Sequence, residues 1–155
     1  MKQGQKQKQQ WLLAGLVLVG GLLILVGVWA RGSNSAAVAI DLDDPQLVAT
    51  GEDVYNTYCA ACHGFDLEGE ANWQQPNADG SFRAPPHDET GHTWHHNDSY
   101  LVESIKLGGV RLEPNIGVSA MPAYDGVLSD AQIAAVLAYI KSSWPSEILE
   151  AQSAR

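Results

Sequence analysis

Cysteine is scarce in this chain of 155 residues: Cys59 and Cys62 are its only two. Two cysteines form at most one bridge, which excludes a miniprotein held together by several disulfides. Basic residues are scarce too, with nine against 18 acidic ones and a formal net charge of −9. A surface this acidic repels nucleic acid phosphates, so we expect no nucleic-acid partner. The chain also lacks an internal repeat and a clear strand pattern, and a helical domain is therefore expected.

Charge is absent from residues 11–30, which read WLLAGLVLVGGLLILVGVWA. At about 1.5 Å per residue, a helix of this length reaches roughly 30 Å, the thickness of the hydrocarbon layer of a bilayer. Trp11 and Trp29 lie near its two ends, where interfacial aromatic residues are common. The pattern predicts a transmembrane anchor at residues 11–30 that follows a short tail, residues 1–10.

The charges on either side of this apolar run predict its orientation. Lys2, Lys6 and Lys8 precede it, and all 18 acids lie beyond Arg31. The positive-inside rule then gives a cytoplasmic N-terminus, a single pass through the inner membrane, and a periplasmic or otherwise extracytoplasmic domain. The alternative is a signal peptide cleaved near Ala37–Ala39, although the run is longer than a usual signal core. Both interpretations export the rest of the chain.

Beyond the apolar run, composition divides the chain into a linker, residues 31–47, a folded domain, residues 48–146, and a C-terminal tail, residues 147–155. The part after residue 31 holds five basic and 18 acidic residues, a formal charge of −13 that suits basic partners. Few large aliphatic side chains lie outside the expected helices, so something besides the chain should help to fill the core.

Capping and apolar spacing predict short helices joined by long loops at 64–91 and 109–128. The first expected helix opens at the capping-box sequence Thr50–Asp53 and runs into the cysteines. The second is capped by Asn97 or Asp98 and continues to about Leu107, with Gly108 as its stop. The third opens at a capping box at Ser129–Gln132 and continues to Ser143.

The cysteines belong to the sequence CAACH, residues 59–63, which has the spacing C-x-x-C-H. This spacing is the attachment signature of c-type haem. Each thiol adds to one vinyl group, the two-residue gap on a helical turn brings both sulfurs to one edge of the ring, and His63 becomes the proximal iron ligand. A covalent haem would also supply the missing core.

Two other functions share this spacing. A thioredoxin-like redox pair expects a strand before the motif and a βαβ setting, neither of which the sequence suggests. Half of a zinc site needs two more ligands, which His87, His92, His95 or His96 can supply. Because His95 and His96 are adjacent, an extended chain would turn them to opposite faces, which disfavours a shared ion. We interpret this histidine cluster as a loop beside the haem.

Residues 48–144 resemble a class I c-type cytochrome. Gly51 and Tyr55 match the family's first helix, and Val136 and Tyr139 match its last. In that family these helices cross closely at the glycine, with the aromatic residue packed against it. The resemblance implies an all-α fold of short helices and long loops wrapped around one covalent haem. The long loop after His63 departs from the short mitochondrial pattern.

The sequence SAMPAY resembles the family's loop that carries the distal methionine, which implies Met121 as the second axial ligand. Elimination agrees, because Met1, the other methionine, is expected on the opposite side of the membrane. The alternative for Met121 is a side chain that fills the core from a loop. A thioether ligand raises the reduction potential of haem iron and occupies its sixth site.

The surroundings of the haem are predicted less sharply. In the family a proline carbonyl accepts a hydrogen bond from the proximal histidine, and Pro85 and Pro86 are both candidates here. Arg83, Trp94 and the nearby histidines are candidate donors to the haem propionates. The alternative for Arg83 is a solvated surface charge.

The leading interpretation is a membrane-anchored monohaem electron carrier, not an enzyme, that exchanges single electrons with redox proteins. Its acidity predicts basic docking surfaces on these partners. A haem subunit of a larger membrane oxidoreductase is the second interpretation. A haem-based sensor or peroxidase requires that Met121 leave the iron open. A metal-handling protein would instead depend on the histidine cluster.

Overall fold

The computed structural model describes residues 39–111 and 117–155. The expected anchor at 11–30 and the tail before it lie outside these residues. In the part of the chain that is described, no helix combines the length and apolar character needed to cross a membrane. The chain divides between Ala36 and Ala37, and the fold below belongs to the second unit, Ala37–Arg155.

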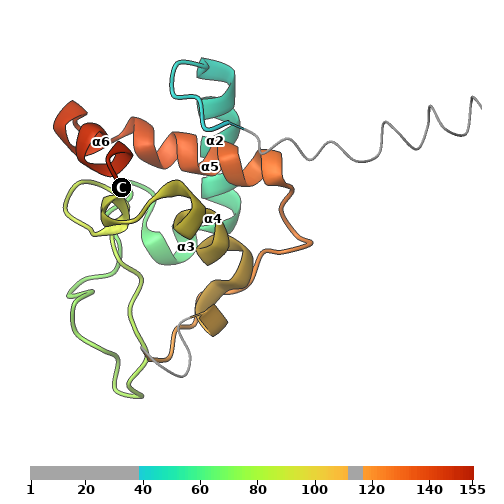
Figure 1. The fold of residues 1–155 in the computed structure, drawn as a ribbon. Coiled ribbons are helices and arrows are strands. Elements are labelled where there is room, and N and C mark those ends of the chain that lie inside the picture. The colour runs from blue at the N-terminus through green and yellow to red at the C-terminus, as the bar shows by residue number, and fades with distance from the viewer. Residues whose placement is uncertain (1–38, 112–116) are drawn as a thin grey trace, which may run out of the picture. The chain divides into compact units, whose positions relative to one another are not determined.

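This unit is built from short helices and long loops (Figure 1). In chain order the described helices are α2 (Pro45–Tyr58), α3 (Ala60–His63), the 3-10 turn η1 (Thr93–His95), α4 (Asp98–Leu107), the 3-10 turn η2 (Gly108–Arg111), α5 (Asp130–Ser142) and α6 (Ser146–Ser153). β-structure among the described residues is limited to two isolated bridges, Phe82–Ser119 and Asp125–Leu128. The expected helical fold class is therefore confirmed for the described residues.

Helix α2 begins earlier than the sequence analysis expected. Asp44 is its N-cap, and its carboxylate accepts from the backbone N–H groups of Gln46 and Leu47. Pro45 occupies the first helical position, where its missing N–H is not needed. The predicted capping box at Thr50–Asp53 is wrong, because the Thr50 hydroxyl donates back to the Gln46 carbonyl inside the helix. A Thr-x-x-Asp sequence in mid-helix resembles a helix start, and the stronger cap lies six residues before it.

The other two helix starts are confirmed. Asn97, not Asp98, caps α4 by accepting from the Tyr100 N–H at 2.9 Å. Ser129 and Gln132 form the predicted reciprocal capping box at the start of α5. Helix α4 ends at Gly108, as expected, with φ +61°. An added Cβ at Gly108 would meet the Pro122 backbone at 2.5 Å, so this glycine lets the segment around residue 121 lie against the end of α4.

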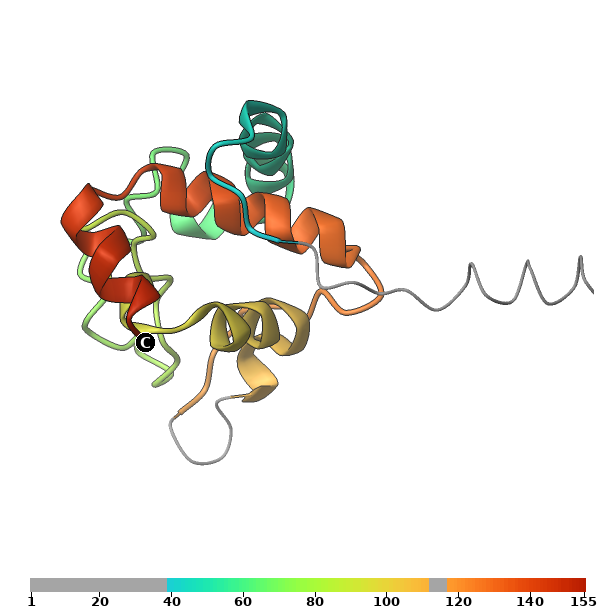
Figure 2. The same ribbon diagram turned by 45° about the horizontal axis from the view of Figure 1, so that its top comes forward.

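Helices α2 and α5 cross at Gly51, in the manner that the family resemblance implied (Figures 1 and 2). A Cβ on Gly51 would lie 2.0 Å from the Ala135 carbonyl oxygen and 2.8 Å from Tyr139 Cβ. Tyr55, fully buried, packs its ring against that of Tyr139 with centroids 5.3 Å apart. Helix α4 contacts α5 on a different side (Figure 2). The buried core residues are Val54, Tyr55, Ala60, Leu67, Leu101, Leu128, Ile133, Val136, Leu137, Ile140 and Trp144.

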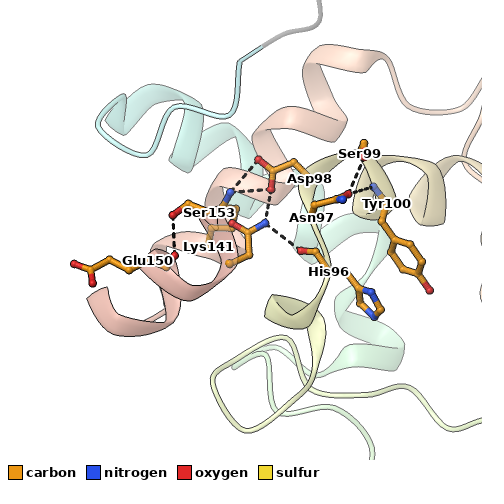
Figure 3. Close-up of polar contacts among 9 residues, drawn as sticks. His96, Asn97, Asp98, Ser99, Tyr100, Lys141, Glu150 and Ser153 are labelled. Atoms are coloured by element: carbon orange, nitrogen blue, oxygen red, sulfur yellow. Dashed lines mark hydrogen bonds and ion pairs between the residues drawn. The ribbon is translucent and has the colours of Figure 1, made fainter. Parts of the chain in front are cut away.

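Helix α6 occupies the segment that the sequence analysis assigned to a C-terminal tail. Its Gln152 is buried and donates to the His96 carbonyl at 3.1 Å and to the Asp98 carboxylate at 2.6 Å. Asp98 also pairs with the buried Lys141 of α5 at 2.9 Å (Figure 3). This network joins α4, α5 and α6. The expected tail is thus wrong, because Ile148 and Leu149 of this segment pack on the core.

Candidate functional site

The two cysteines and His63 lie on a single helical turn. Cys59 ends α2, with its N–H bonded to the Tyr55 carbonyl at 2.8 Å, and it is also the N-cap of α3. The Cys59 carbonyl then accepts from the N–H groups of Cys62 at 3.1 Å and His63 at 3.0 Å. Both thiols are free, Cys59 half-buried and Cys62 exposed. Burial, and then the nearby Cys62, raise the pKa of the Cys59 thiol to about 11.

His63 is buried, and its ring is held by the backbone of a distant loop. Nδ1 lies 2.8 Å from the Pro85 carbonyl oxygen, across 22 residues of sequence. A carbonyl only accepts, so Nδ1 carries the proton and Nε2 keeps the lone pair that binds a metal. Burial lowers the pKa of His63, which favours this neutral form, while the bond to Pro85 and the charge of Glu70 partly oppose the shift. Of the two candidate prolines, the structure selects Pro85.

The turn Cys59–His63, called the attachment turn from here on, is also held by Tyr55. The Tyr55 hydroxyl lies 3.3 Å from the His63 carbonyl and 3.0 Å from the Gly64 carbonyl, and it donates to this pair. Burial raises the pKa of this phenol strongly, so the hydroxyl stays a donor. Tyr55, which packs against α5 through Tyr139, thus links the α2–α5 crossing to the backbone of His63.

The histidine cluster does not converge on one point. His87 stacks on His63, with ring centroids 4.1 Å apart and planes 26° from parallel. Each of the others stacks on an aromatic ring: His92 on Trp73, His95 on Trp94 and His96 on Tyr100. Within residues 39–111 and 117–155, no three His, Cys, Asp or Glu side chains are grouped as metal ligands. Burial, followed by the neighbouring His63 and His92, lowers the pKa of His87 well below its usual value.

Met121 lies in an irregular segment tied to several other elements. Its carbonyl accepts from the Gly109 N–H at 2.8 Å, and its own N–H donates to the Ser119 hydroxyl at 3.2 Å. Tyr124, three residues on, donates from its hydroxyl to the Tyr58 carbonyl at 2.6 Å, directly before the first cysteine. Burial, and then the charges of Cys59 and Cys62, raise the pKa of Tyr124. The segment that contains Met121 therefore reaches the edge of the attachment turn.

The candidate propionate donors differ in how far they are already engaged. The indole N–H of Trp94 donates to the Glu89 carbonyl at 3.3 Å. Nη1 of Arg83 donates to the Ala71 carbonyl at 2.7 Å, while its Nε is buried without a hydrogen-bond partner. A buried guanidinium N–H without a partner is costly, so Arg83 retains one donor for an anionic group. An anchored guanidinium of this kind differs from a freely solvated surface charge.

Sequence reasoning did not find the parts played by Tyr124 and Trp144. The indole N–H of Trp144 donates to the His87 carbonyl at 2.7 Å. Nothing local in the sequence indicated either bond, because they join residues 66 and 57 positions apart. The proximity of His87 to His63 was missed for the same reason. The only available signal was that His87 directly follows the two candidate prolines.

A helical domain with two free thiols and an imidazole on one turn is typical of the class of haem-binding c-type electron carriers. The model of the cytochrome c family matches residues 48–144, well over half of the chain, and the chain belongs to this family. Membership implies covalently bound haem c and the role of a haem-based electron carrier. Neither the search of curated proteins nor that of solved structures gives a significant match.

The residues present fit a haem. Cys59 and Cys62 offer free thiols for the two thioether bonds, and Nε2 of His63 is left as a lone-pair donor by the bond of Nδ1 to Pro85. The buried Nε of Arg83 is available for a propionate.

Proposed function

We propose that the chain is a membrane-anchored monohaem cytochrome that carries single electrons on the periplasmic side of the membrane, with His63 and Met121 as axial ligands. The observation that carries this proposal is the hydrogen bond from His63 Nδ1 to the Pro85 carbonyl at 2.8 Å. This bond keeps the proton on Nδ1 and leaves the lone pair of Nε2 on the side of the ring away from Pro85. His63 directly follows Cys62, the second thiol.

When bound, the haem supplies the one-electron couple of its iron. The chain's part is to hold the ligands still, so that little reorganises when the charge of the site changes. His63 is held by Pro85 and through the hydroxyl of Tyr55, and the backbone of Met121 is held by Gly109 and Ser119. A thioether from Met121 would favour the reduced iron and occupy the sixth site, which disfavours a sensor or peroxidase.

The anchor and the partners are supported by the sequence. The charge-free run of residues 11–30 has the length of a membrane span, and a linker to it would keep the domain near the membrane plane. The formal charge of −13 beyond residue 31 favours redox proteins with basic docking surfaces. Extraction from membranes by detergent but not by high salt tests the anchor. Electron transfer to the captured native partner that fails to slow as salt rises would contradict the electrostatic docking.

A haem subunit of a larger membrane oxidoreductase is the second candidate, because the same domain can accept electrons inside a fixed complex. Mild detergent extraction followed by affinity capture separates the two. A stoichiometric complex that survives extraction supports a subunit, and a monodisperse single chain supports a carrier.

The central experiment is a test for covalent haem on the full chain, produced with a working cytochrome maturation system. The denatured wild-type protein should show a haem-stained band at 16.7 kDa plus one haem, and iron analysis should give one iron per chain. The double variant Cys59→Ser and Cys62→Ser is the matched control and should lose the band. An unstained wild-type band would refute the proposed function.

A further inference from the structure

We propose that His87 is a positioning residue for the proximal ligand: it sets the rotational orientation of the His63 imidazole plane. This inference rests on the proposed function, in which His63 binds the haem iron. It concerns the contact of two rings across 24 positions, His63 and His87, and not the histidine cluster as a metal site.

The bond to Pro85 does not by itself fix the plane of the His63 ring. A carbonyl oxygen accepts hydrogen bonds over a broad range of directions, so the 2.8 Å contact holds the position of Nδ1 while the ring can still rock about it. The flat His87 ring, stacked on one face of the His63 ring with centroids 4.1 Å apart, limits that freedom, because rotation towards His87 drives the two faces together. The segment 85–87 therefore contacts the His63 imidazole twice: the Pro85 carbonyl binds Nδ1 at its edge, and the His87 ring packs on its face.

His87 can restrict the His63 ring because its own backbone and ring are held by hydrogen bonds. The backbone N–H of His87 donates to the Leu67 carbonyl at 2.7 Å, and the His87 carbonyl accepts from the Trp144 indole N–H at 2.7 Å. Nδ1 lies 2.9 Å from the Thr93 hydroxyl, which in turn lies 3.4 Å from the Pro86 carbonyl. If the hydroxyl donates to Pro86, it accepts from His87 Nδ1, which makes this nitrogen the protonated one.

The His87 ring also contacts Tyr55. The ring of Tyr55 meets it edge-on, with centroids 6.0 Å apart and planes at 77°. The Tyr55 hydroxyl also donates to the His63 and Gly64 carbonyls, so the Tyr55 side chain contacts both the ring of His87 and the backbone of His63. The three rings form one packed group whose members come from α2, α3 and the loop between α3 and η1.

The orientation of an axial imidazole plane determines how the unpaired electron of low-spin ferric iron is distributed over the porphyrin. Proton NMR reads this distribution through the spread of the haem-methyl shifts, a signal that a change in overall stability does not move. The test therefore uses the full-length ferric holoprotein in four variants: His87→Phe, His87→Leu, Thr93→Val and, as a matched control, Thr50→Val.

His87→Leu keeps an apolar side chain but removes the flat face, and we expect an altered or doubled set of haem-methyl shifts with haem attachment unchanged. His87→Phe restores a flat ring and should bring the pattern back towards wild type. Thr93→Val leaves His87 in place but removes the bond to its Nδ1, and a smaller change in the same direction is expected. Thr50→Val likewise replaces a threonine hydroxyl by a methyl group, but at an exposed position of α2 where the hydroxyl donates to the Gln46 carbonyl, and it should leave the shifts unchanged.

The inference is overturned if His87→Leu and Thr93→Val both give the wild-type pattern of shifts, or if Thr50→Val changes it as much as they do. Thr93→Val keeps the test decisive if His87→Leu does not fold. Failure of the proposed function gives a different result, because the wild-type chain would then carry no covalent haem and show no haem-methyl resonances.

Discussion

Substitution of Gly51 by alanine tests the helix crossing on which the attachment turn depends. An added Cβ would lie 2.0 Å from the Ala135 carbonyl oxygen. Unbonded carbon and oxygen atoms rarely approach closer than about 3.3 Å, so α2 and α5 must separate locally by about 1.3 Å. The obstructing atom belongs to the backbone of α5, so no side chain can rotate away to relieve the clash.

Two opposing terms set the size of the effect. Alanine gains about 1 kcal/mol of helix propensity over glycine in a helix interior. Overpacking of a well-packed core costs about 1–3 kcal/mol, and the rigid backbone contact places this site at the upper end. A net loss of about 2 kcal/mol is therefore expected, which corresponds to a fall in Tm of roughly 10 °C for a domain of this size.

The assay is thermal unfolding of the holoprotein, followed by far-ultraviolet circular dichroism. Glu52→Ala, at the exposed neighbouring position of the same helix, is the matched control and should change stability by less than about 0.5 kcal/mol. Gly51→Val should be worse than Gly51→Ala, because its branches add bulk at the same point. A Gly51→Ala variant as stable as wild type would refute the close crossing.

Two further predictions address other parts of the structure. Lys141→Met keeps the apolar stem but removes the pair with Asp98, and urea unfolding should show a loss of about 1–3 kcal/mol. Lys106→Met, which breaks the more exposed pair with Asp130, should have a clearly smaller effect, and equal losses would contradict the role of burial. Met121→Ala should abolish the near-infrared sulfur-to-iron band of the oxidised protein and lower its reduction potential. A wild-type protein without that band would show that Met121 is not the sixth ligand.

Features that depend on a few consecutive residues were predictable. The attachment turn is one of them, since the C-x-x-C-H spacing and the helical period already bring Cys59, Cys62 and His63 together. The Ser129 capping box and the stop at Gly108 were predicted for the same reason. The start of α2 was misplaced because two capping sequences compete there, and the packing of the helix against α5 favours the longer one.

By itself, then, the sequence determined the local chemistry of this protein: two thiols and an imidazole at a haem-binding spacing, in a chain whose apolar run predicts export. The tertiary structure decided everything that requires distant residues to meet. It selected Pro85 over Pro86 as the partner of His63, stacked His87 on the His63 ring, and folded the expected tail into α6. The physical reason is that a turn or a cap is determined by neighbours in sequence, whereas these contacts arise only when long loops close against a packed pair of helices.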